Sequence, residues 1–92
     1  MVVNKNKIAL SSLALDLKRV ALSYFRGSDK VAERFLKEAF LRREEVDKNK
    51  IKKYLVKLLD DLDNFENEKD KKKVAEDALM YSKLFENASL LL

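Results

Sequence analysis

Residues 4–28 read NKNKIALSSLALDLKRVALSYFRGS and include Gly27, the only glycine of this 92-residue chain. Polar side chains recur in this segment at intervals of three and four residues, namely Ser12, Asp16, Arg19, Ser23 and Arg26. This spacing is typical of an α-helix and predicts one from about residue 4 to residue 26. We expect the five polar residues to form one narrow stripe that faces solvent.

Apolar side chains cover more than half the circumference of this predicted helix. They are Ile8, Ala9, Leu10, Leu13, Ala14, Leu15, Leu17, Val20, Ala21, Leu22, Tyr24 and Phe25. A helix that is apolar on more than one side has to be covered on more than one side. The sequence therefore predicts either the central helix of a bundle or a surface on which two copies of the chain meet.

Three further helices are predicted after Gly27 and Ser28, which suit the end of one helix and the N-cap of the next. The second helix has Val31, Ala32, Phe35, Leu36, Ala39, Phe40 and Val46 on one side. The third has Ile51, Tyr54, Leu55, Leu58, Leu59, Leu62 and Phe65, and the fourth has Val74, Ala75, Ala78, Leu79, Tyr81, Leu84, Phe85 and Ala88. We expect an all-α fold, a small bundle of about four antiparallel helices in a single domain over residues 1–92. Its core should bury Leu13, Leu17, Phe35, Leu58 and Leu84.

The joints on either side of the third helix lack glycine and proline. Asp47 or Asn49 could cap the third helix, and residues 64–70 could cap the fourth, while longer continuous helices remain the alternative. Charge favours the breaks, because the third helix has lysines at its start and acids at its end, against the preference of the helix dipole. If the chain folds back, the acids Asp60, Asp61, Asp63 and Glu66 meet Lys69, Lys71, Lys72 and Lys73, and Glu44, Glu45 and Asp47 meet Lys48, Lys50, Lys52 and Lys53.

The residue types that are missing exclude several chemistries. With no cysteine and no histidine, the chain has no disulfide, no thiol nucleophile and neither of the commonest ligands of zinc. The apolar run of residues 8–15 is too short to span a membrane and lacks the features of a signal peptide. We expect a cytoplasmic protein with no cofactor and no enzymatic activity.

One acidic segment partly resembles a calcium-binding loop. Asp61 and Asp63 fit the first two ligand positions of an EF-hand, but Phe65 takes the third. Glu66 replaces the glycine at the sixth position, and Lys72 replaces the glutamate at the twelfth. We therefore interpret this segment as a solvated helix end, with no metal site.

Two classes of function remain, of which the first is a protein-interaction module, most simply a homodimer. The candidate partner or dimer surface consists of Ile8, Leu15, Leu22, Phe25, Leu90, Leu91 and Leu92. A domain of this size has little capacity to bury such an excess of apolar side chains. The alternative for the C-terminal leucines is that they fold back over one end of the core.

The second class is nucleic-acid binding, suggested by a net charge of +4 and by local runs of basic residues. An antiparallel bundle would gather Arg42, Arg43, Lys48, Lys50, Lys52 and Lys53 at one pole, together with Lys5 and Lys7. The same pole contains Glu44, Glu45 and Asp47, and a lysine-rich face is usually only a solvated one. We rank nucleic-acid binding second.

Overall fold

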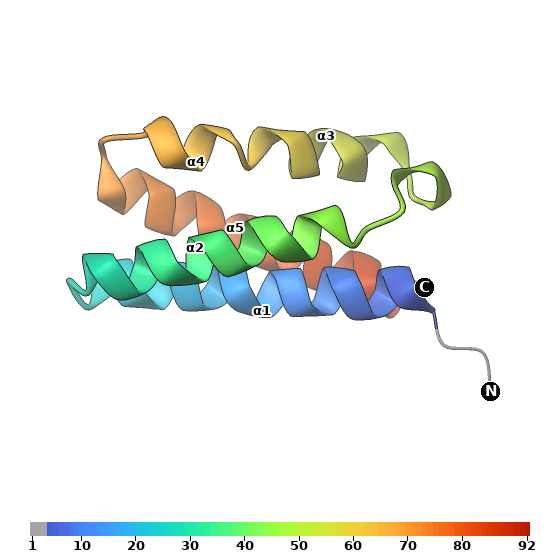
Figure 1. Ribbon diagram of the computed structural model, residues 1–92, viewed down its shortest axis with the longest axis horizontal. Coiled ribbons are helices and arrows are strands. Elements are labelled where there is room, and N and C mark those ends of the chain that lie inside the picture. Colours follow the sequence, from blue (N-terminus) through green and yellow to red (C-terminus); the bar gives the residue numbers. More distant parts are fainter. Residues whose placement is uncertain (1–3) are drawn as a thin grey trace.

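The computed structural model describes residues 4–92 and shows a small all-α bundle, as expected. Residues 1–3 of the predicted domain lie outside the described residues. The helices are α1 (Lys5–Phe25), α2 (Asp29–Glu44), α3 (Lys53–Asp61), α4 (Asn64–Asn67) and α5 (Lys71–Leu90), with a short 3₁₀ helix at Lys48–Lys50 (Figure 1).

Helix α1 is the central element of the bundle and packs along both α2 and α5. The first residue of α5, Lys71, lies over the ring of Tyr24 near the end of α1. The hydroxyl of Ser82, in the middle of α5, donates a 2.8 Å hydrogen bond to the backbone oxygen of Ala14. Since Leu92 lines a pocket with Lys5 at the start of α1, α1 and α5 run in opposite directions (Figure 1).

Small side chains bring α1 close to its two neighbours. The buried residues of α5 are Val74, Ala75, Ala78, Ser82, Phe85, Ala88 and Ser89, and those of α2 are Ala32, Leu36 and Ala39. The separation of two packed helices depends on the size of the side chains between them. Alanine and serine therefore favour close packing against α1, as the hydrogen bond from Ser82 to the Ala14 backbone shows for α5.

Helices α3 and α4 form a separate layer, which lies above α2 and α5 in Figure 1. The layer contributes large side chains to the core, namely Leu55, Leu59, Leu62 and Phe65, all at most 5% exposed. The ring centroid of Phe65 lies 5.5 Å from that of Tyr81, which in turn lies 6.2 Å from that of Phe85. This aromatic row connects α4 with the middle of α5.

Gly27 ends α1 as the sequence predicts. It has a φ of +77°, in the left-handed region that side chains disfavour. Its N–H donates to the oxygen of Tyr24 at 3.0 Å, and the N–H of Ser28 donates to the oxygen of Ser23 at 2.8 Å. This pair of bonds is a Schellman motif. Ser28 is the N-cap of α2, but its side chain makes no capping hydrogen bond.

The predicted breaks on both sides of the third helix exist, although their details differ from the prediction. Asp47 caps the 3₁₀ helix instead of α3, and Lys52 precedes α3 without a side-chain cap. The third helix was predicted to continue to Phe65. A turn at residues 62–63 instead separates its last part, which forms the single turn of α4. Asp70 caps α5 by accepting hydrogen bonds from the N–H groups of Lys72 and Lys73.

The predicted core is correct in part. Leu13 and Leu17 are fully buried, and Phe35 and Leu58 are partly buried against the core. Leu84 is 37% exposed, so its predicted burial is wrong. The close packing of α1 against Ser82 turns the buried face of α5 towards the serine and Phe85, which leaves Leu84 at the edge of that face.

The predicted solvent-facing stripe of α1 is correct only in part, because Arg19 and Arg26 are exposed but two of its five residues are buried. Asp16 is 7% exposed and Ser23 is 8% exposed. Arg42 of α2 extends towards the Asp16 carboxylate, which places this part of the stripe at the α1–α2 interface. The solvent-facing stripe of α1 instead contains large apolar residues, because α2 and α5 cover the other two sides of the helix.

Candidate interaction surface

The solvent-facing side of α1 has a regular row of residues. Ile8, Ser11, Leu15, Lys18, Leu22 and Phe25 follow one another at alternating intervals of three and four, and all six are exposed. Ile8 is 53% exposed, Leu15 48%, Leu22 39% and Phe25 52%. Alternation of three and four is the spacing of a helix that packs against a parallel or antiparallel helix. We call these six residues the α1 row.

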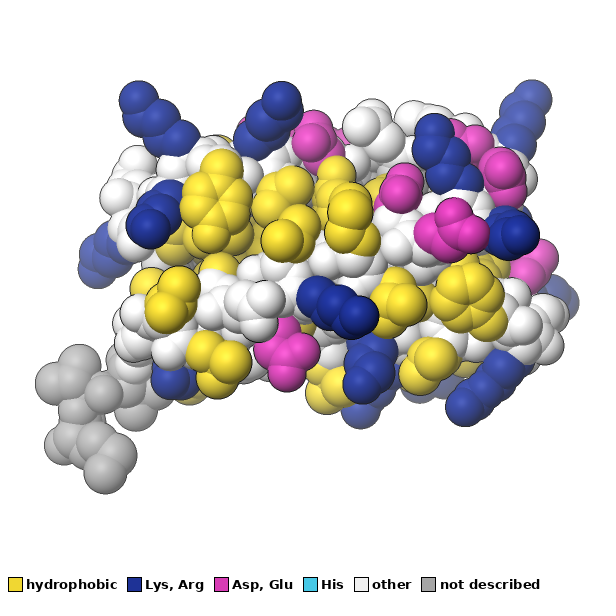
Figure 2. All heavy atoms as spheres, turned by 180° about the vertical axis from the view of Figure 1, so that it is seen from behind, with side chains coloured by type: hydrophobic (Ala, Val, Ile, Leu, Met, Phe, Trp, Pro, Cys, Tyr) yellow, Lys and Arg dark blue, Asp and Glu magenta, His cyan; other side chains and the backbone are white. Residues whose placement is uncertain are grey.

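A shallow groove runs beside the α1 row, where α1 meets α5. A pocket of about 250 Å³ in it is lined by Ser11, Ala14, Leu15, Lys18, Ser82 and Glu86. Lys18 and Glu86 thus stand on opposite walls of one groove. Within residues 4–92, neither forms an ion pair within 4.0 Å. Figure 2 shows this side of the molecule, where hydrophobic and basic side chains are interspersed over the surface.

The C-terminal leucines lie at the end of the bundle where α1 begins. Leu90 is 67% exposed, Leu91 82% and Leu92 40%. Leu92 lines a pocket with Asn4 and Lys5. The structure therefore leaves all seven residues of the predicted surface exposed, and the three leucines do not fold back over the core.

The charges on the outer side of α1 are all positive. Lys5, Lys7, Lys18 and Arg19 are exposed, whereas Asp16, the only carboxylate of the helix, is buried. One Asp16 oxygen lies 3.7 Å from Arg19 and the other lies 3.9 Å from Arg42. Burial raises the pKa of the Asp16 carboxyl above its ordinary value, although the two guanidinium groups act in the opposite direction.

Both arginines of the predicted basic pole are paired with acids. Arg42 contacts Glu45 at 3.1 Å and also faces Asp16. Arg43 lies 2.7 Å from Asp63 and donates a second hydrogen bond to the backbone oxygen of Leu59.

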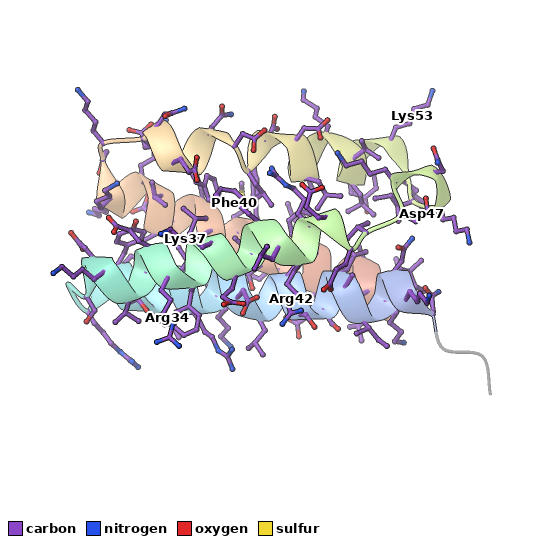
Figure 3. The ribbon with its side chains drawn as sticks, in the orientation of Figure 1. Arg34, Lys37, Phe40, Arg42, Asp47 and Lys53 are labelled. Atoms are coloured by element: carbon purple, nitrogen blue, oxygen red, sulfur yellow. The ribbon has the colours of Figure 1, made fainter. Side chains whose placement is uncertain are left out.

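The lysines of the pole divide into two kinds. Lys48 pairs with Asp60 at 2.9 Å, and Lys50 lies 4.0 Å from Asp47. Lys52 and Lys53 are exposed and form no ion pair with residues 4–92, and Figure 3 shows Lys53 directed away from the bundle.

The predicted contact of the acids of the third helix with the lysines of the fourth is wrong for Asp60 and Asp63, whose partners precede α3. Lys73 lies 3.7 Å from Glu68, an acid that the prediction did not include.

Asn6 is a structural residue that the sequence analysis missed. Its side chain is buried at the start of α1, with 5% exposure. Its amide nitrogen donates to the backbone oxygen of Asp47 at 3.1 Å, and its amide oxygen accepts from the backbone N–H of Asp47 at 2.8 Å. An asparagine near the N-terminus of a helix is so common as a cap that nothing in the sequence distinguishes this one.

Two other pockets lie elsewhere on the bundle. One, of about 260 Å³, lies between α2 and α4, with Tyr24, Phe40 and Phe65 in its lining. A smaller one, of about 130 Å³, has Asp61, Glu68, Lys73 and Asp77 around it. No group of three acidic side chains in residues 4–92 is arranged to hold a metal ion, and no helix in the same range is long and apolar enough to cross a membrane.

Comparisons of the chain with models of protein families, with curated proteins and with solved structures found no match.

Proposed function

We propose that this protein is a non-enzymatic interaction module that associates with a second copy of itself through the α1 row and the C-terminal leucines at the end of the bundle where α1 begins. The observation that carries the proposal is the row itself, in which four large apolar side chains are between 39% and 53% exposed along one helix. Scattered apolar residues are ordinary on protein surfaces, but several large ones aligned along one side of a helix are typical of a contact surface.

The position of α1 supports this proposal. The helix is held on two sides by α2 and α5, so its third side is presented on a rigid support. A preformed apolar surface loses little conformational entropy when it binds. The heptad-like spacing of the row suits a second helix more than a flat or irregular partner.

Nucleic-acid binding has weaker support. Arg42, Arg43, Lys48 and Lys50 each lie within 4.0 Å of a carboxylate, so two of the six candidate contact residues, Lys52 and Lys53, have no acid partner in residues 4–92. The affinity of such proteins for DNA comes largely from the number of phosphates that they neutralise.

The experiment is a mass measurement by light scattering across a micromolar dilution series. We expect about twice the chain mass of 10.7 kDa. The double variant Leu15→Glu, Leu22→Glu should be a folded monomer, with its helical content checked by circular dichroism. Leu41→Glu is the matched control, because Leu41 is 62% exposed on α2, outside the α1 row, and its replacement should leave the dimer intact. A monomeric mass for the natural chain at every concentration would refute the proposed self-association.

A further inference from the structure

The α1 row has one symmetric antiparallel pairing that uses all six of its residues. In this pairing Ile8 of one copy lies opposite Phe25 of the other, Ser11 lies opposite Leu22, and Leu15 lies opposite Lys18. Shifting the second helix by one heptad in either direction leaves two positions of each row without a partner. Because buried apolar area favours the pairing with most contacts, the unshifted register is preferred.

Side-chain size suits the same register. The small Ser11 leaves room for Leu22 of the second copy, and the Ser11 hydroxyl already has a partner in the backbone oxygen of Ile8, at 3.0 Å. Leu15 lies opposite Lys18, whose four-carbon stem can cover the leucine while its ammonium group reaches towards solvent or an acid. Each end of the seam brings together an isoleucine and a phenylalanine.

The groove between α1 and α5 supplies the acid for that ammonium group. Leu15 and Glu86 line the same pocket, so the lysine that is placed opposite Leu15 arrives next to Glu86. Glu86 has no ion-pair partner in residues 4–92, and neither has Lys18. Two-fold symmetry produces this contact twice, since each copy offers both members of the pair.

Building on the proposed self-association, we infer that two copies pair α1 against α1 in antiparallel orientation, about an axis between Leu15 and Lys18. Each Lys18 forms an ion pair with Glu86 of the second copy. The pairing also brings Arg26 near Lys7 of the second copy at each end of the seam, a contact between exposed like charges that salt screens. The two ion pairs between Lys18 and Glu86 set the register, and the apolar contacts provide most of the affinity.

Charge reversal tests the inference. Lys18→Glu places an acid next to Glu86 in each of the two symmetric contacts. Glu86→Lys places a lysine next to Lys18 in each of them. We expect each single variant to have a dimer dissociation constant at least about tenfold higher than that of the natural chain, since juxtaposed like charges are costly. Lys57→Glu is the matched control, because Lys57 is exposed on α3 and should leave the dissociation constant unchanged.

Mixing the two variants separates a contact between copies from one within a copy. An equimolar mixture of Lys18→Glu and Glu86→Lys should form a heterodimer about as tight as the natural dimer, because it contains one natural Lys18–Glu86 pair and one pair with reversed signs. A pair formed within one chain would be rescued only by both substitutions in the same chain, and mixing the two variants would not tighten their association.

The failure of this inference is distinguishable from that of the proposed function. If both single variants remain dimers while Leu15→Glu, Leu22→Glu dissociates, the α1 row is the interface but the inferred register is wrong. If the natural chain is a monomer at all concentrations, the self-association itself is refuted.

Discussion

The side chain of Asn6 forms two hydrogen bonds with the backbone of Asp47, one as donor at 3.1 Å and one as acceptor at 2.8 Å. The two residues are 41 positions apart, so this contact attaches the start of α1 to the segment that follows α2. An amide is the side chain that supplies a donor and an acceptor at once in this geometry. The contact fixes the beginning of the 3₁₀ helix, which Asp47 then caps.

Replacing Asn6 should therefore destabilise the fold. Asn6→Ala removes both bonds and should lower the free energy of unfolding by about 1–3 kcal/mol, as measured by urea denaturation. Asn6→Asp has nearly the same shape but turns an oxygen towards the Asp47 carbonyl, so we expect a loss at least as large at neutral pH. Asn87→Ala, on the exposed side of α5, is the control and should change stability little. An Asn6→Ala variant as stable as the control would contradict the structural role.

Asp16 provides a pH prediction. Burial raises the pKa of its carboxyl, so the folded protein binds a proton there more readily than the unfolded chain, whose value is 3.8. As the pH falls from neutral towards 3.8, protonation of Asp16 should therefore stabilise the folded state relative to Asp16→Asn, which cannot titrate. The measurement is the difference in unfolding free energy between the two proteins at a series of pH values. The opposite slope would mean that Arg42 and Arg19 outweigh the desolvation of the carboxylate.

The two N-caps of α2 and α5 should differ in importance. Asp70 accepts hydrogen bonds from two N–H groups of α5, whereas the Ser28 side chain accepts none from α2. We expect Asp70→Ala to cost about 0.5–2 kcal/mol of stability, the usual range for a lost cap, and Ser28→Ala to cost much less. Denaturation curves of the two variants test this, and equal losses would show that the caps are equivalent in solution.

Leu84 and Phe85 offer a test of which way α5 faces. Phe85 is fully buried, so Phe85→Ala should cost about 3–5 kcal/mol, a large share of the stability of a domain of this size. Leu84 is 37% exposed, and its truncation to alanine should cost clearly less. A larger loss at position 84 than at position 85 would mean that α5 is rotated about its axis.

The features that the sequence predicts correctly are those governed by local rules. The period of 3.6 residues predicts the helices, and Gly27 ends α1 as its residue type suggests. Asp70 lies within the stretch from which a cap was expected. Each of these follows from residues within a few positions of one another.

The features that the sequence does not predict depend on which helix packs against each side of α1. Asp16 and Ser23 of the polar stripe are buried, while Leu15 and Leu22 of the same helix are exposed. Hydrophobicity predicts the reverse, because it assigns the most polar stripe of a helix to solvent. Small residues on α2 and α5 permit a close approach that outweighs this preference, and an amphipathicity pattern does not contain that information. The apolar row was nevertheless identified as a candidate surface, because α1 has more apolar surface than two neighbours can cover.

The last prediction concerns the basic pole. Replacing Lys48, Lys50, Lys52 and Lys53 by serine removes four positive charges, but the first two already pair with Asp60 and Asp47. We therefore expect the natural chain to bind duplex DNA weakly, with a shallow dependence of log affinity on log salt. The slope is about −0.9 for each phosphate neutralised, so Lys52 and Lys53 alone would give a slope of about −2.

A control with the same charge change replaces Lys30, Lys37, Lys57 and Lys72, which are exposed elsewhere on the bundle. If both fourfold variants weaken binding equally, the attraction comes from net charge and the pole has no special role. Tight binding at physiological salt that only the first variant abolishes, with the helical content unchanged, would instead make nucleic-acid binding the better account of the protein.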